Sequence, residues 1–166
     1  ADDPFRQRLM ARLVSDARSL SAALPSEEID ERALTALKGL IAAAVALPDH
    51  AGFLTRALRF LPQEITRQVL PDGCHVERSP AAQLAALQDL TEIRALLQAS
   101  QTQPPPALTN AIERMAPALR VMRHGDGGLA LFNGSKEESG TLIDLVLTQA
   151  GRGGRGPSSL VDGGFQ

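Results

Sequence analysis

Residues 108–122, LTNAIERMAPALRVM, carry the clearest helical pattern in the chain. Leu108, Ile112, Met115, Leu119 and Met122 are spaced four and three residues apart, which places them on one face of an α-helix. Pro117 interrupts the pattern, and we expect it to kink the helix without ending it. Working outward, the same spacing recurs on both sides of this stretch, so the sequence predicts an all-α fold.

The other expected helices are separated by proline or glycine. They cover residues 3–24, 26–47, 51–70 and 80–100 before the central stretch, and 135–150 after it. Ser79 and Pro80 have the residue types of an N-cap and a first helical position. Ser135 and Glu138 match a capping box, which predicts that the last helix begins at Ser135.

Two polar loops interrupt the helices, at residues 72–80 (DGCHVERSP) and 123–136 (RHGDGGLALFNGSK). Short linkers make consecutive helices antiparallel, so alternate linkers lie at the same end of a helical stack. Both polar loops follow odd-numbered helices and should therefore lie together. We predict antiparallel helical hairpins that form part of an incomplete (α/α) toroid over residues 1–150. The glycine-rich stretch from residue 151 to 166 is then a connector.

The composition excludes several classes of function. The chain has 166 residues and a net charge of −2, with no Trp and no Tyr, which argues against a nucleic-acid partner. A single cysteine excludes an internal disulfide or a site with several thiolates. No apolar run approaches the roughly 20 residues that span a bilayer, so we expect no membrane insertion. Because the chain begins with Ala and ends within an apolar pattern, we expect an internal piece of a longer protein, whose oligomeric state stays open.

The first polar loop combines an imidazole, a carboxylate and a guanidinium. If residues 74–79 are extended, His75 and Glu77 lie on one face, where the carboxylate favours one tautomer of the imidazole. Arg78 offers a planar fork that suits a carboxylate or a sulfate. The alternative interpretation is that Glu77 and Arg78 pair with each other or cap neighbouring helices.

The second polar loop offers His124, Asp126 and Asn133 between glycines. His124 also fits a purely structural role, because a cation at a helix C-terminus is favoured by the helix dipole. Asn133 precedes a glycine and fits a turn residue. Asp126 with a histidine could bind a divalent ion, but the spacing matches no strong ligand motif, so we expect neither a metal nor another cofactor.

The segments LPQEITRQVLPDGCHVERSP (61–80) and IERMAPALRVMRHGDGGLALFNGS (112–135) resemble bacterial heparinase II/III-like proteins of the alginate-lyase-like superfamily. The resemblance extends from Asp3 to Gln166. It implies an incomplete (α/α) toroid followed by a β-sandwich domain beyond the connector, and a location in the cell envelope or periplasm. The implied partner is an acidic polysaccharide.

Characterised members of that family cleave uronate-containing polysaccharides by β-elimination. The resemblance therefore implies catalytic roles for His75, His124 and Glu77. It implies substrate binding by a second group of residues, namely Arg78, Gln68, Asp126 and Asn133. Related lyases have a Tyr-His pair shortly after the E-x-S element, whereas Ser79-Pro80 is followed here by Ala81-Ala82-Gln83. The alternative function is therefore a non-catalytic protein that binds acidic glycans.

Overall fold

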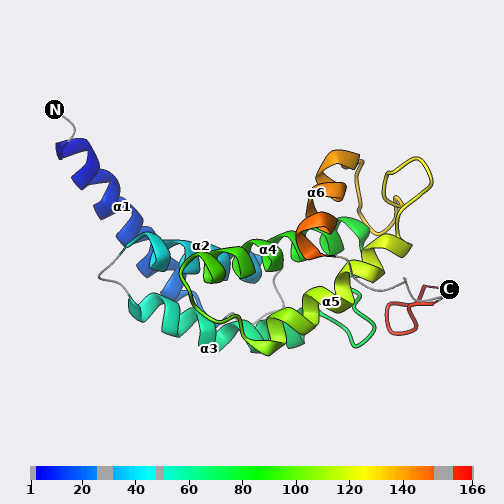
Figure 1. The fold of residues 1–166 in the computed structure, drawn as a ribbon, viewed down its shortest axis with the longest axis horizontal. Helices are drawn as coiled ribbons and strands as arrows, with labels where there is room; N and C mark the ends of the chain where they lie inside the picture. The colour runs from blue at the N-terminus through cyan, green and yellow to red at the C-terminus, as the bar shows by residue number, and fades with distance from the viewer. Residues whose placement is uncertain (1–2, 26–31, 48–50, 152–158, 166) are drawn as a thin grey trace.

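The computed structural model describes residues 3–25, 32–47, 51–151 and 159–165, and regular secondary structure in these ranges is helical (Figure 1). The helices are α1 (Asp3–Ala22), α2 (Arg32–Ala46), α3 (Ala51–Gln68), α4 (Pro80–Ala99), α5 (Pro106–Val121) and α6 (Gly140–Ala150). The all-α prediction is confirmed. The predicted start of the second helix, at residues 26–28, lies outside the described residues.

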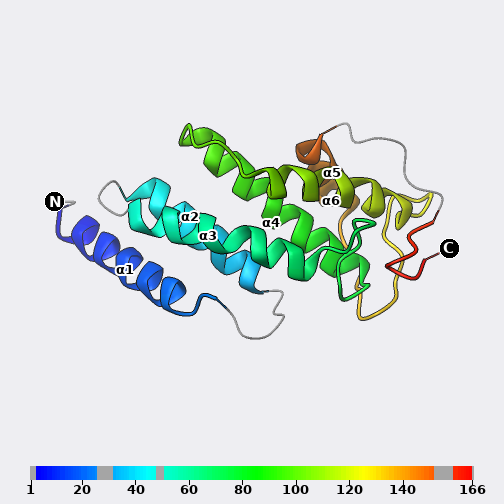
Figure 2. The ribbon, with the colours of Figure 1, turned by 90° about the horizontal axis from the view of Figure 1, so that it is seen from below.

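The helices form two rows, and the chain passes from one row to the other. α4 packs against α2 and α6 in one row, α3 packs against α5 in the other, and α1 packs against both α2 and α3. From α2 to α5, consecutive helices run in opposite directions, as predicted (Figure 2). α6 departs from this order, because it stands steeply across α4 in Figure 1 and is seen nearly end-on in Figure 2. The incomplete (α/α) toroid remains a prediction.

The core lies between the two rows and is built from the apolar positions that the helical spacing predicts. Leu108, Ile112, Met115 and Leu119 of α5 are completely buried. They face apolar side chains of α4 with exposures of 3% or less, namely Leu84, Leu87, Leu90, Ile93 and Leu97. Burial of this kind contributes roughly 1.5–3 kcal/mol per large side chain and holds the ends of α3, α4 and α5 in register.

The start of α4 agrees with the sequence prediction, but the start of α6 does not. Ser79 is the N-cap of α4 and Pro80 follows at the first helical position. α6 begins at Gly140 with Ser139 as its N-cap, so the capping box predicted at Ser135 is wrong. Instead, the Ser135 Oγ accepts the backbone N–H of Ala81 at 3.0 Å, and thus caps α4 from a distant part of the chain.

Residues 159–165 return to the same end of the molecule as the two polar loops. Leu160 and Phe165 exchange backbone hydrogen bonds of 2.8 and 2.9 Å, and Leu160 is completely buried. Its neighbours in this small cluster include Cys74 and Met122. Among the described helices, none combines the length and the apolar character needed to cross a bilayer.

Candidate functional site

The first polar loop is a tight hairpin that continues directly from α3. Leu70 N–H donates to the Cys74 carbonyl at 2.8 Å, and Val76 N–H donates to the Gln68 carbonyl at 2.9 Å. Gly73 turns the chain with φ +88°, and a Cβ at this position would lie 2.3 Å from the carbonyl oxygen of Arg114. Only glycine fits a backbone approach this close. The hairpin therefore lies directly against α5.

Residues 76 and 77 form a turn, so the expectation of an extended segment is wrong. Arg78 N–H donates to the His75 carbonyl at 2.9 Å, and Arg78 has φ +52°. The turn separates the two side chains that an extended chain would bring together: His75 is 1% exposed, whereas Glu77 is exposed. This backbone therefore does not place the His75 imidazole and the Glu77 carboxylate on one face.

The imidazole of His75 belongs to a buried chain of hydrogen bonds. The Glu77 N–H donates to His75 Nδ1 at 3.3 Å, and His75 Nε2 lies 3.1 Å from Gln68 Oε1. Gln68 Nε2 in turn donates to Glu64 Oε1 at 2.6 Å. Because Nδ1 accepts, the ring proton lies on Nε2, which donates to Gln68; this is one neutral tautomer. Each group in this chain therefore donates to the next, from the Glu77 N–H through His75 and Gln68 to the Glu64 carboxylate.

Gln83 of α4 holds this hairpin against α5 and was not identified from the sequence. Its Oε1 accepts the His75 N–H at 2.6 Å, and its Nε2 donates to the carbonyls of Gly73 and Met115 at 2.8 and 3.1 Å. The side chain is completely buried. A signal existed, because Gln83 has the same helical spacing as Leu87 and Leu90 and is thus a polar residue on the apolar face of α4.

The two polar loops meet, as the alternation of helix directions predicts. Asn133 Nδ2 donates to the Arg78 carbonyl at 2.7 Å, and the hydroxyls of Ser79 and Ser135 are 3.0 Å apart. Asn133 has φ +48°, so the interpretation as a turn residue is correct, and its amide also joins the loops.

The segment 159–165 adds a third contact to the first loop. Gly163 N–H donates to Asp72 Oδ2 at 2.7 Å, and an Arg78 guanidinium nitrogen lies 3.4 Å from the Asp162 carbonyl. Burial, together with the nearby Asp72 carboxylate, raises the pKa of Cys74 to about 12. The thiol is therefore a packing group and not a nucleophile at neutral pH.

Four of the seven residues predicted for the site line two cavities, whereas Glu77, Arg78 and Asn133 line neither of them. The His75 cavity, of about 240 Å³, is lined by His75 and Gln68 together with residues of α2 and α4, namely Arg32, Thr35, Ala82, Ala85, Ala86 and Asp89. In the same lining, Asp89 accepts a hydrogen bond of 2.6 Å from Thr35 and pairs with Lys38 at 2.5 Å. This polar wall was not foreseen from the sequence.

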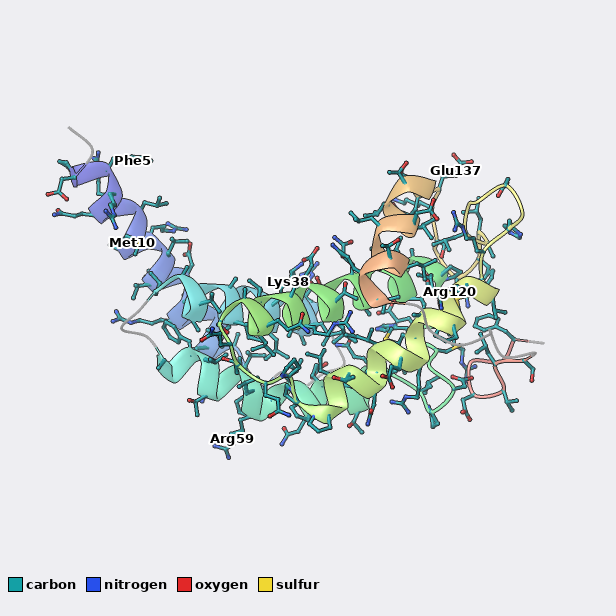
Figure 3. The ribbon with its side chains drawn as sticks, viewed as in Figure 1. Phe5, Met10, Lys38, Arg59, Arg120 and Glu137 are labelled. Atoms are coloured by element: carbon teal, nitrogen blue, oxygen red, sulfur yellow. The ribbon has the colours of Figure 1, made fainter. Side chains whose placement is uncertain are left out.

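The His124 cavity is larger, about 500 Å³, and lies in the second loop against the start of α6. His124 and Asp126 line it together with Glu137 and Glu138, which are exposed carboxylates. Figure 3 shows Glu137 on the loop that precedes α6. Within the described residues, no group of three or more His, Cys, Asp or Glu side chains is arranged to hold a metal ion.

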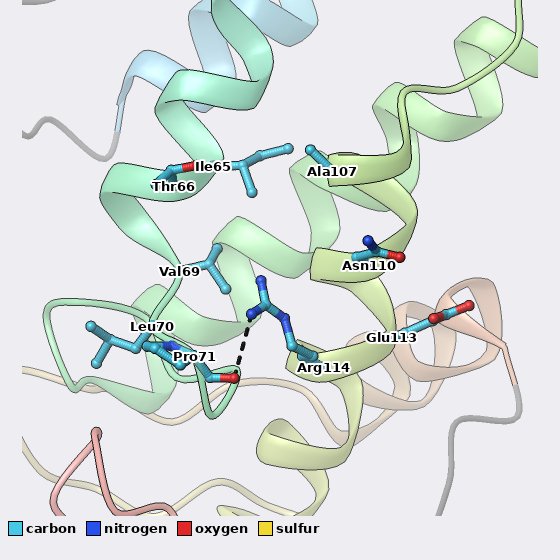
Figure 4. A pocket seen from close by; sticks show the side chains of 9 residues that line it. All are labelled: Ile65, Thr66, Val69, Leu70, Pro71, Ala107, Asn110, Glu113 and Arg114. Atoms are coloured by element: carbon cyan, nitrogen blue, oxygen red, sulfur yellow. Dashed lines mark hydrogen bonds between the residues drawn. The ribbon is translucent and has the colours of Figure 1, made fainter.

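A third cavity, of about 630 Å³, lies behind the first loop, between α3 and α5 (Figure 4). Ile65, Val69 and Ala107 form its apolar lining. Arg114 reaches across it and donates to the Pro71 carbonyl at 3.4 Å. The guanidinium thus braces the outer side of the hairpin.

The comparison with known families agrees with this arrangement of helices and loops. The family model described as the heparinase II/III N-terminus matches residues 14–150. The chain belongs to the heparinase II/III family. Both polar loops and all the predicted site residues lie inside the matched range, so the family resemblance seen in the sequence is confirmed.

One characterised relative is FtsZ-localized protein C of Caulobacter vibrioides, which is 32% identical over 135 residues. The aligned region covers 81% of this chain and 23% of the relative, so the chain spans about a quarter of that protein's length. No solved structure matches the chain.

Proposed function

We propose that this chain belongs to a polysaccharide lyase-like protein that binds an acidic, uronate-containing polysaccharide at the two joined loops and cleaves it by β-elimination. Family membership supports a lyase-related protein. The observation that carries the proposal is the contact between the loops. Asn133 donates to the Arg78 carbonyl and the Ser135 hydroxyl contacts that of Ser79, so the two loops are joined at one end of the fold. A cell-envelope location is part of the proposal.

β-Elimination from a uronate needs a cation or donor at the carboxylate, a base for the proton next to it, and an acid for the leaving oxygen. Arg78 is exposed at the tip of the first loop and can pair with a carboxylate through its planar fork. Arg78 has a left-handed backbone, and the Asn133 amide donates to its carbonyl, so the backbone that carries the guanidinium is held in place.

The two histidines are assigned different roles. His124 is exposed in the cavity of about 500 Å³, where a sugar ring can reach its imidazole. We assign to it both the abstraction of the proton next to the carboxylate and the return of that proton to the leaving oxygen, so that the glycosidic C–O bond breaks as the double bond forms. His75 is buried with both ring nitrogens bonded, so we assign it, with Gln68, to positioning the loop that carries Glu77 and Arg78. The exposed carboxylates of Glu77 and Asp126 flank the bound chain.

A second candidate, a non-catalytic protein that binds acidic glycans, is favoured by two observations. His75 lacks the free ring nitrogen that a base requires, because one accepts from Glu77 N–H and the other bonds to Gln68. The sequence also has no tyrosine. The relative named FtsZ-localized protein C is described by where it localises, which is consistent with a role other than cleavage for domains of this kind.

Cleavage is tested by following the ultraviolet absorbance of unsaturated uronate with alginate and with glycosaminoglycans as substrates. The lyase proposal expects product from the wild type, a loss of at least 100-fold in His124→Ala, at the lower end of what a general base contributes, and a smaller loss in His75→Gln. Full activity in His124→Ala would show that the base is misassigned. No product with any substrate would favour the non-catalytic candidate.

Binding is tested separately by titrating the protein with acidic oligosaccharides. Arg78→Ala should weaken binding about tenfold, which corresponds to roughly 1.4 kcal/mol. Arg59→Ala is the matched control, because Arg59 is exposed on α3 and points away from the loops in Figure 3. Equal affinities of the two variants would place the binding site elsewhere.

A further inference from the structure

Residues 159–165 form a small hairpin of their own, which we call the 159–165 segment. Leu160 and Phe165 exchange backbone hydrogen bonds, and Gly164 turns the chain with φ +79°. Figure 1 shows the segment in red, at the end of the molecule that carries the two polar loops. A short stretch with a defined backbone therefore lies beside the proposed glycan site.

The segment packs tightly against the first polar loop. Leu160 is completely buried in the cluster that contains Cys74. A Cβ at Gly163 would lie 2.4 Å from Cys74 Sγ and 2.9 Å from Cys74 Cβ, so no side chain fits at this position. Because Gln83 already holds the first loop against α5, an atom added at Gly163 should displace the segment and not the loop.

Polar and aromatic contacts join the segment to both loops. Asp72 accepts two backbone N–H groups, that of Cys74 at 3.0 Å and that of Gly163 at 2.7 Å. The ring centroids of Phe132, in the second loop, and Phe165 are 5.1 Å apart, which is within the range of favourable aromatic pairs. The segment is thus bonded to one loop and packed against the other.

The same segment provides an acceptor for the side chain of Arg78. Its guanidinium donates to the Asp162 carbonyl at 3.4 Å. A carbonyl oxygen accepts an N–H without neutralising the cation, and among the described residues no carboxylate forms an ion pair with Arg78. The charge of the guanidinium therefore remains available to a carboxylate from outside the chain.

We propose that the 159–165 segment is a positioning element that holds the Arg78 guanidinium ready for a uronate carboxylate, an inference that rests on the proposed function. The Asn133 amide holds the backbone of Arg78, and the Asp162 carbonyl holds the far end of its side chain. A long side chain that is ordered before binding loses less conformational entropy when the glycan arrives. The segment thus raises the affinity for the glycan without touching it.

The affinity test displaces the segment without changing any charge. Gly163→Ala should weaken the binding of an alginate hexasaccharide or a heparan sulfate hexasaccharide roughly threefold in calorimetric titrations. A His124→Ala background keeps the probe from being cleaved. Adding Cys74→Ala removes the sulfur atom that the new methyl group meets, and should restore most of the affinity. Gly125→Ala is the matched control, since a Cβ there meets nothing within 4 Å.

A double-mutant cycle separates positioning from a general structural effect. In an Arg78→Ala background, Gly163→Ala should cause no further loss of affinity, because no guanidinium is left to position. Phe165→Ala releases the segment from the second loop and should give the same pattern, so the test also works if Gly163→Ala fails to fold in thermal melting. Equal losses with and without Arg78 would overturn the proposal.

The order of the Arg78 side chain is measured without any glycan. In protein with nitrogen-15 arginine, the heteronuclear NOE of the Arg78 Nε–H should be high in the wild type and fall in Gly163→Ala. Arg78→Lys identifies the signal by its loss. Unchanged order in Gly163→Ala and in Phe165→Ala would overturn the proposal even if the wild type binds glycan. A wild type that binds neither hexasaccharide, but loses the order of Arg78 in these variants, would overturn the proposed function and still support the positioning of Arg78.

Discussion

Replacing Gln83 with leucine should destabilise the protein far more than a single surface substitution does. Its amide makes three hydrogen bonds to backbone groups of His75, Gly73 and Met115. The Met115 carbonyl lies inside α5 and keeps its helical partner, so the substitution leaves two buried groups unsatisfied, the His75 N–H and the Gly73 carbonyl. At roughly 1–3 kcal/mol for each buried group left without a partner, we expect a loss of about 4 kcal/mol in the free energy of unfolding.

The loss is measured by urea unfolding followed by circular dichroism. Gln98→Leu is the matched control, because Gln98 is exposed on the same helix and should change the free energy of unfolding by less than about 0.5 kcal/mol. Hydrogen exchange should also show faster exchange at the His75 amide in Gln83→Leu. A loss below about 1 kcal/mol, with His75 still protected, would refute the view that Gln83 holds the hairpin.

Three further predictions concern the same end of the molecule. Ser135→Ala should lower the free energy of unfolding by about 1 kcal/mol, because α4 loses its cap. Ser139→Ala should lower it clearly less, since Ser139 makes no side-chain cap bond. Equal losses in urea unfolding would contradict the distant cap. Gly73→Ala should cost at least about 3 kcal/mol, because its Cβ would meet a backbone carbonyl of α5, whereas Gly134→Ala, with a similar φ but open surroundings, should cost about 1 kcal/mol. Cys74, with its pKa raised to about 12, should resist a thiol reagent at pH 8 in the folded protein and react at once in urea, and rapid labelling without urea would show that the thiol is accessible.

The fold could be predicted because local spacing carries most of it. The apolar positions of α4 and α5 repeat at three and four residues, and the same residues form the buried core. Proline and serine also marked the start of α4 correctly at Ser79 and Pro80. These signals act within one or two turns of helix, so they are visible in a linear sequence.

The details that could not be predicted depend on contacts between distant residues. Ser135 matches a local capping box, but its hydroxyl bonds to Ala81 because the two loops meet in space. In the same way, His75 and Glu77 separate because a left-handed Arg78 makes a turn that the Asn133 amide stabilises. The spacing of residues along the chain does not reveal that Ser135 bonds to Ala81 or that Asn133 bonds to Arg78.

The sequence predicted which residue types form the site, and the structure places those residues in different surroundings. Gln68 and His75 face a small cavity beside Asp89, whereas His124 and Asp126 line a second cavity. The sequence identified which loops hold the polar residues. Which histidine is reachable depends on burial by α2 and α4, elements that the loop sequences do not contain.

The cap that Ser135 provides to α4 has a consequence for the order of events during protein synthesis. The hydroxyl that completes the first turn of α4 lies 54 residues after Ala81, the residue whose N–H it accepts. At roughly 5–20 residues per second, the ribosome adds that serine about 3–11 s after the start of α4. Until then the new helix begins with an unpaired amide, so a nascent chain that stalls before residue 135 exposes a frayed first turn to chaperones and proteases.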